Sequence, residues 1–153
     1  MSHRFAVLAL ASLGAASAVA PTHVNLRVPV TLGVPNPCAP GETVVLSGTV
    51  HLVGQVRTDA SGTTARLNVN LQNFGGRTEA GRLYRAALNG KATLDLAAGG
   101  LPAQASGQVH VRLISQGPTD NFSFKLKLDV AVDANGNVAV APPTALPEGT
   151  CNG

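Results

Sequence analysis

The chain has 153 residues, a net charge of +3 and few aromatic side chains: four phenylalanines, one tyrosine and no tryptophan. A length of this order suits one domain with a single core. Proteins that hold single-stranded nucleic acid need a basic groove together with stacking rings. The sequence has no run of Lys and Arg and few rings, so we expect no nucleic-acid partner.

The first residues have the features of a secretory signal peptide. Met1–Arg4 is a short basic start, Phe5–Ala16 is an uncharged apolar run, and Ala16-Ser17-Ala18 matches the small-x-small cleavage pattern. The apolar run is too short to span a bilayer comfortably. We therefore predict a signal peptide at 1–18, one mature domain at 19–153 and export to the periplasm or the extracellular space. No transmembrane segment is expected after cleavage, which would remove Arg4 and lower the net charge from +3 to +2.

The mature chain begins with an alternating stretch, 19–34, in which Pro29 lacks the N–H that a ladder needs. We expect an edge strand or an irregular lead-in there. The segment 35–41 contains three prolines and predicts a rigid, extended connector. A long strand follows at 42–57, with Gly48 on its apolar face, where a glycine allows a bend or the close approach of another layer.

A hairpin is predicted around the turn at 59–62. Counting back from this turn pairs Val56 with Ala65, and the apolar faces of the strand 42–57 and of the strand 63–72 then match. The glycine-containing segment 73–81 has no alternation and is predicted to be a loop.

Two shorter strands are expected at 82–88 and 91–96. They flank Asn89-Gly90, a dipeptide typical of two-residue hairpin turns, so we predict that they pair with each other. The segment 97–107 is rich in Ala and Gly and weak in pattern, and we predict that most of it is loop.

The clearest pattern is a three-stranded meander within 104–141. Apolar residues follow one parity on both sides of the turn at 117–120. These residues are Val109, Val111, Leu113, Phe122, Phe124, Leu126, Leu128, Val130 and Val132. The last turn, Ala134-Asn135-Gly136, fits a three-residue hairpin loop with glycine in the left-handed position, which pairs Val132 with Val138.

No stretch of ten or more residues in the mature chain shows a helical period with caps. The sequence predicts an all-β fold, an antiparallel meander of seven to eight strands closed as a small β-barrel, with a two-sheet β-sandwich as the alternative. The only cysteines, Cys38 and Cys151, are predicted to form a disulfide, because an even pair in an exported chain reads as a covalent link. It would close a loop of over a hundred residues, worth roughly 4–5 kcal/mol in the chain-entropy model.

The candidate binding residues lie on the polar parity of the strands. His51 and His110 form either a ligand-binding or acid–base pair, or two solvated surface histidines. His110, Arg112, Lys125 and Lys127 must cluster on one hairpin, where like charges repel unless an anion relieves them. A small anion or an acidic polysaccharide is one interpretation, and a solubilising face is the other. We find no catalytic motif, no metal-ligand set and no cofactor motif.

Several blocks resemble a family of small, exported bacterial β-rich proteins to which no function is assigned. The resemblance lies in Asn36-Pro37-Cys38, Leu46–His51, Tyr84-Arg85-Ala86, Ile114–Gly117, Asp120-Asn121-Phe122, Asp133–Gly136 and Cys151. The blocks occur in order along nearly the whole mature chain, although 70–81 departs from the family pattern. The resemblance implies secretion, a β fold and the cysteine pair, and it implies no catalytic residues.

Three functions are compatible with these features. The first is a non-catalytic barrel that binds a small apolar or amphipathic molecule in its interior, as lipocalin-like carriers do. The second is an interaction module that uses the basic polar face. The third is a small barrel enzyme built on His51 and His110, which the scarcity of polar residues on the inward parity disfavours. An outer-membrane barrel would share the alternation, but its aromatic girdles are missing.

Overall fold

The computed structural model describes residues 20–87 and 91–153, so the predicted signal peptide at 1–18 lies outside the described part. The described residues form one antiparallel sheet of ten strands. The strands are β1 (Thr22–Pro35), β2 (Thr43–Asp59), β3 (Gly62–Thr78), β4 (Leu83–Ala86), β5 (Lys91–Ala98), β6 (Ala103–Ser115), β7 (Asn121–Val132), β8 (Val138–Val140), β9 (Thr144–Ala145) and β10 (Thr150–Asn152). Within 20–87 and 91–153 no helix is long and apolar enough to cross a membrane.

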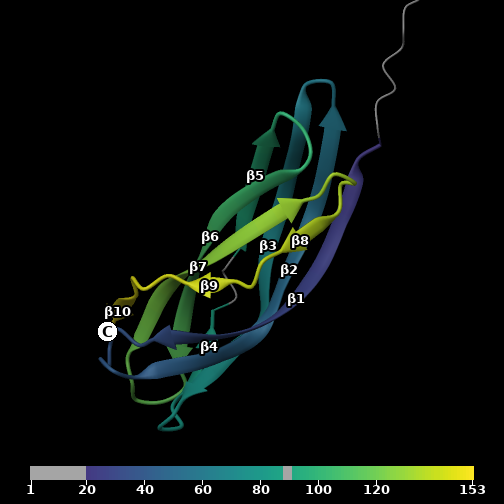
Figure 1. Ribbon diagram of the computed structural model, residues 1–153. Coiled ribbons are helices and arrows are strands. Elements are labelled where there is room, and N and C mark those ends of the chain that lie inside the picture. Colours follow the sequence, from purple (N-terminus) through teal and green to yellow (C-terminus); the bar gives the residue numbers. More distant parts are fainter. Residues whose placement is uncertain (1–19, 88–90) are drawn as a thin grey trace, which may run out of the picture.

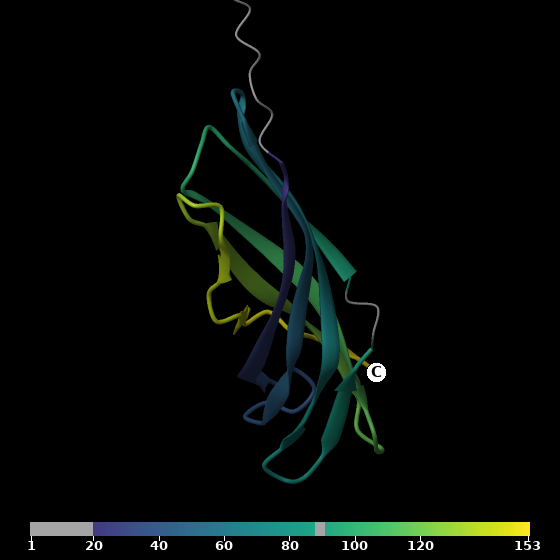
Figure 2. The same cartoon turned by 90° about the vertical axis from the view of Figure 1, so that its right-hand side faces the viewer.

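The sheet curls into a half-barrel (Figures 1 and 2). Its strands follow the order β1-β2-β3-β4-β6-β7-β10, while β5 pairs with β3, and β8 and β9 pair with β7. The all-β antiparallel prediction is confirmed. The predicted closure is wrong, because no ladder among the described residues joins β1 to β7 or to the short strands beyond it. The segment that faces β1 contains Pro142, Pro143 and Pro147, and residues without an N–H cannot complete such a ladder.

Alternation in the strands produces one continuous core inside the curl. Every residue of the predicted apolar parity in β6 and β7 is buried, with exposed fractions of 2% or less. Pairing of Val56 with Ala65 and of Val132 with Val138 is also as predicted. Gly136 has a φ of 83°, the left-handed conformation expected in the last turn.

A β-bulge explains why the predicted loop at 73–81 is largely strand. The register between β2 and β3 shifts between Ser47 and Thr49, and Asn73 on β3 has a φ of 54°. The extra residue moves the inward parity of β3 by one position, so that Phe74 is buried after Leu71. Strand β3 therefore continues to Thr78 without the unbroken alternation by which a strand is recognised.

Strand β3 is long enough to pair with two others, and this arrangement contradicts the hairpin predicted for 82–88 and 91–96. One end of β3, Gly75–Arg77, pairs with β4, and the other end, Thr63–Asn70, pairs with β5. The turn that leads into β4 has Gly81 at a φ of 83°. Asn89-Gly90, on which the predicted hairpin depended, lies outside the described residues.

Strand β6 begins at Ala103, inside the segment predicted to be loop. Its pattern is weak because Gly107 faces the core without a side chain. A Cβ at Gly107 would lie 2.7 Å from Leu94 Cδ1, so the Leu94 side chain fills the space that a residue of β6 would otherwise occupy.

A disulfide links the two ends of the strand order, the β1–β2 connection and β10. Cys38, in the β1–β2 connection, is bonded to Cys151 in β10, with the two Cα atoms 5.0 Å apart, which confirms the predicted pairing. Nearby, Asn36 Nδ2 donates a hydrogen bond to the hydroxyl of the buried Tyr84 (3.2 Å), and that hydroxyl donates to Thr119 Oγ1 (3.3 Å). These contacts tie the β1–β2 connection, β4 and the β6–β7 turn together.

Candidate functional site

The two candidate histidines do not form a pair. His51 lies on β2, where its Nε2 is 2.8 Å from Asn25 Oδ1 and its Nδ1 is 3.3 Å from Gln72 Nε2. Both ring nitrogens therefore lie within hydrogen-bond distance of a neighbouring amide side chain. His110 lies on β6, opposite Lys125. The arrangement gives His51 a structural role in linking β1, β2 and β3.

The predicted cluster of cations forms on the outer face of β6 and β7. His110 is directly opposite Lys125, Arg112 is opposite Ser123, and Lys127 is opposite Gln108. Arg112 is therefore the diagonal neighbour of Lys125, and Lys127 is the diagonal neighbour of His110. In a regular sheet such diagonal neighbours are about 7–8 Å apart. All four side chains are exposed or half-buried.

Strand β4 extends this cluster by one more cation, which the sequence alone did not identify. Arg85 is exposed and lies opposite Ile114, so Arg112 is its diagonal neighbour. The backbone N–H of Ala87 donates to Arg112 O (2.8 Å), which continues the same register. We call this set the basic ladder: Arg85, His110, Arg112, Lys125 and Lys127. Arg85 was missed because the partner of β4 could not be derived from local pattern.

One carboxylate among the described residues offsets the basic ladder. Asp129 Oδ2 lies 3.2 Å from Lys127 Nζ, and Asp129 also accepts a hydrogen bond from the Ser106 hydroxyl. The Ser106 hydrogen bond, followed by Lys127, holds the pKa of Asp129 below its usual value. The described structure contains no ion pair of Arg85, Arg112 or Lys125, so positive charge predominates along the ladder.

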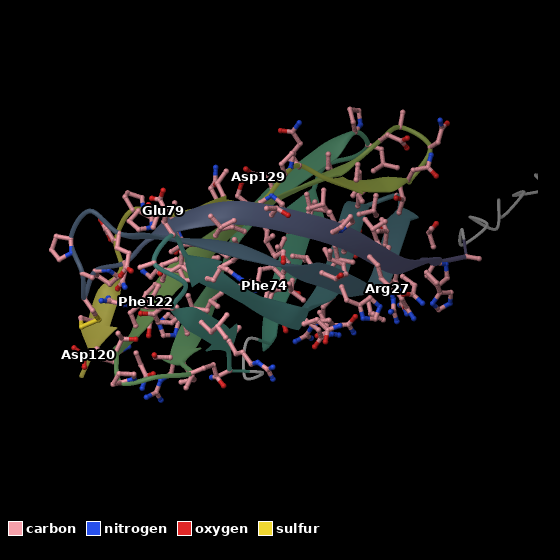
Figure 3. The ribbon with its side chains drawn as sticks, turned by 90° about the horizontal axis from the view of Figure 1, so that it is seen from below. Arg27, Phe74, Glu79, Asp120, Phe122 and Asp129 are labelled. Carbon is pink, nitrogen blue, oxygen red and sulfur yellow. A yellow bond between two sulfur atoms is a disulfide. The ribbon has the colours of Figure 1, made fainter. Side chains whose placement is uncertain are left out.

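The phenylalanine and tyrosine side chains of the described residues take no part in the basic ladder. Phe74, Tyr84, Phe122 and Phe124 are buried, with exposed fractions of 4% or less, and Figure 3 shows Phe74 and Phe122 inside the curled sheet. Flat stacking contacts with bases or sugar rings are therefore not available from these four residues. The side chains that the basic ladder offers to a ligand are therefore charged groups and hydrogen-bond donors.

The interior is filled by side chains. Ten core residues from β2, β3, β6 and β7 have an exposed fraction of 0%: Val44, Leu46, Val50, Leu52, Val69, Leu113, Phe122, Leu126, Leu128 and Val132. A side chain without accessible area borders no space that a water molecule could enter. These ten residues therefore do not line a cavity of the kind that a carrier needs for its ligand.

A metal site is not formed at the cysteines. Among the described residues, one group of three potential ligands lies close together, namely Cys38, Asp120 and Cys151. Both sulfur atoms belong to the disulfide, and a metal-binding cysteine has to be a thiolate.

Comparison with known proteins identifies no relative. The chain matches no family model, no curated protein and no solved structure. The resemblance to exported bacterial β-rich proteins therefore stays a prediction.

Proposed function

We propose that this chain is an exported, non-catalytic β protein that binds an extended acidic polysaccharide through the basic ladder. The observation that carries the proposal is the unbroken cross-strand succession of four cationic residues and His110 over β4, β6 and β7, with Asp129 as their one described ion-pair partner. Like charges in neighbouring cross-strand positions destabilise a sheet. A bound polyanion converts this repulsion into attraction.

Three further features support an acidic glycan over the other ligand classes. The ladder crosses three strands diagonally, which suits an extended ligand better than a compact one. The aromatic residues are buried, so the ladder offers a ligand charge without stacking rings. Proteins that bind single-stranded nucleic acid commonly use such rings in addition to charge, which favours the glycan. The filled core favours the outer face over the interior carrier that the apolar alternation suggested first.

Export is part of the same proposal. The disulfide between Cys38 and Cys151 is compatible with an oxidising compartment. Acidic polysaccharides occur at cell surfaces, so a periplasmic or extracellular protein would meet them there. No cofactor is needed for this function, since binding is its only chemistry.

The test is a titration of the exported, oxidised protein with an oligogalacturonate, with an uncharged maltooligosaccharide as the ligand control. The double variant Arg112→Gln/Lys125→Gln should bind the acidic oligomer roughly tenfold more weakly, since each exposed charge pair contributes up to about 1 kcal/mol. The affinity of the unmodified protein should fall steeply with added salt, because exposed charges are screened.

The control for loss of charge outside the ladder is Arg27→Gln, which removes one positive charge where the double variant removes two. Arg27 lies on β1, toward the end of the molecule away from Asp120 (Figure 3), and outside the ladder. This variant carries one positive charge fewer but should keep near-normal affinity. Equal weakening by both variants would indicate a general charge effect, and binding of the uncharged oligosaccharide with the same affinity would exclude the proposal.

A further inference from the structure

A second surface feature lies beside the ladder, over the bulged end of β3. Gly75 points outward between Ser47 of β2 and Arg85 of β4. Because glycine has no side chain, the outer face has a hollow of about 500 Å³ at this point. We call it the Gly75 hollow. Its volume lies in the range of about 300–1,000 Å³ that is typical of small-molecule sites.

The rim of the Gly75 hollow combines aliphatic and cationic side chains. Val45, Arg77 and Leu83 stand in one cross-strand row on β2, β3 and β4. Val45 and Leu83 are exposed by 54% and 49%, and they are two of the three large hydrophobic side chains exposed among the described residues. Both line the hollow together with Arg77 and Arg85. Single exposed aliphatic residues are ordinary, but two that face each other across an arginine at one hollow form an amphipathic site.

The arginines at and near the hollow differ in whether they are paired with a carboxylate. Arg77 and Arg85 form none of the described ion pairs, whereas the nearby Arg82 is paired with Glu42 at 3.2 Å. Guanidinium groups bind carboxylate, sulfate or phosphate through paired N–H donors. A groove of about 1080 Å³ adjoins the hollow and shares Val45 and Arg77 with it; its lining also includes Glu42 and Glu79, so the apolar contacts of a ligand are at Val45 and Leu83.

We propose that the Gly75 hollow binds a small amphipathic anion, a medium-length aliphatic chain with an anionic head group of the fatty-acid type. The head group contacts Arg77 and Arg85, and the chain lies against Val45 and Leu83. This site shares Arg85 with the basic ladder and is otherwise independent of polysaccharide binding.

The test is a calorimetric titration of the exported protein with decanoate below its micelle-forming concentration. Acetate supplies the head group without the chain, and octyl glucoside supplies the chain without the charge. Decanoate should bind, and both controls should bind at least about tenfold more weakly, because each lacks one half of the recognition. Equal binding of decanoate and octyl glucoside, or no binding of decanoate, would overturn the proposal.

Variants locate the site. Leu83→Ser and Arg77→Gln should each weaken decanoate binding by about fivefold or more. Val53→Ser and Arg27→Gln are the matched controls, since Val53 is the third exposed aliphatic residue (37%) and both positions lie outside the hollow; they should change nothing. Should Leu83→Ser fail to fold, Val45→Thr replaces it with the same expectation. Unaltered binding by the hollow variants would overturn the proposal.

The two proposals fail separately. Lys125→Gln should weaken oligogalacturonate binding and leave decanoate binding unchanged, since Lys125 does not line the hollow. Leu83→Ser should have the opposite pattern. A variant of either kind that weakened both ligands equally would contradict the assignment of two sites.

Discussion

Gly48 and Phe74 determine how β2 and β3 stay paired across the bulge. A Cβ on Gly48 would lie 2.4 Å from Phe74 Cδ2 and 2.9 Å from Phe74 Cα. The Phe74 ring is 4% exposed and has little freedom to move away. The glycine therefore provides the space into which the shifted parity of β3 places its aromatic ring.

Replacing Gly48 by alanine should lower the free energy of unfolding by about 1–3 kcal/mol, because overpacking forces the ring or the backbone to shift. Urea unfolding of the purified protein measures this loss. Gly99→Ala is the control, since a Cβ there would meet no atom within 4 Å and should change stability by no more than about 0.5 kcal/mol. Equal stability of the two variants would contradict the role given to Gly48.

Asp133 organises the β7–β8 turn. Its carboxylate accepts hydrogen bonds from the backbone N–H of Asn135 (2.8 Å) and of Asn137 (2.9 Å) and from Asn137 Nδ2 (3.0 Å). The side-chain bond from Asn137 contributes most to lowering the pKa of Asp133 below its usual value of 3.8.

This lowered pKa predicts a pH-dependent loss of stability. Because the folded pKa is lower than the unfolded one, the carboxylate stabilises the fold at pH values above the unfolded pKa, and the contribution disappears as the pH falls through the folded pKa. Asp133→Asn should therefore lower Tm at neutral pH, and the difference from the unmodified protein should shrink as the pH falls below about 4. Thermal unfolding over a pH series measures it. A Tm difference that is constant over the whole series would show that the charge is not involved.

At the scale of elements, the disulfide joins two parts of the sheet that no described ladder connects. Cys38 and Cys151 are 113 residues apart in sequence, and β10 contacts β7 through only three paired positions. The bond therefore restrains both the unfolded chain and the short last strand.

The double variant Cys38→Ala/Cys151→Ala should lose about 2–5 kcal/mol of unfolding free energy, the usual cost of removing a disulfide that closes a long loop. Reduction of the unmodified protein should produce a similar loss, which serves as the control for the substitutions themselves. Chemical unfolding of oxidised, reduced and variant protein provides the comparison. A change below about 1 kcal/mol would mean that hydrogen bonds such as that from Asn36 to Tyr84 hold this end without the bond.

The same elements show how far the sequence predicts the fold. In β6 and β7 nearly every core position has a large apolar side chain, so period two identifies the faces and the register. In β3 the bulge at Asn73 reverses the parity, and at Gly107 of β6 a glycine replaces an apolar residue because Leu94 fills its place. Local pattern contains no information about such compensation between strands, which is why 73–78 and 103–107 were predicted as loop.

Pairing between segments far apart in the sequence also limited the prediction of the site. His110, Arg112, Lys125 and Lys127 share one hairpin, and their clustering follows from that alone. Arg85 joins them because β4 pairs with β6, and Arg77 lies near Arg85 because β4 also pairs with β3. These pairings join segments far apart in the sequence, and the local pattern of one segment does not identify its partner strand.

For the whole molecule, the curled sheet separates an apolar interior from a polar exterior. The side chains that a carrier would use to line a cavity are packed against one another at 0% exposure. The cations and the Gly75 hollow lie outside, on the surface formed by β2, β3, β4, β6 and β7. The inner face therefore stabilises the fold, and both proposed binding sites lie on the outer face.

The most direct test of this division is an NMR titration of the isotope-labelled, oxidised protein with oligogalacturonate. Backbone amide signals of the ladder strands, at His110, Arg112 and Lys125, should shift with added ligand, while the methyl signals of the core residues Leu113 and Leu126 should hardly move. Large shifts of those core methyl signals, with the ladder amides unchanged, would place the ligand in the interior and contradict binding at the outer face.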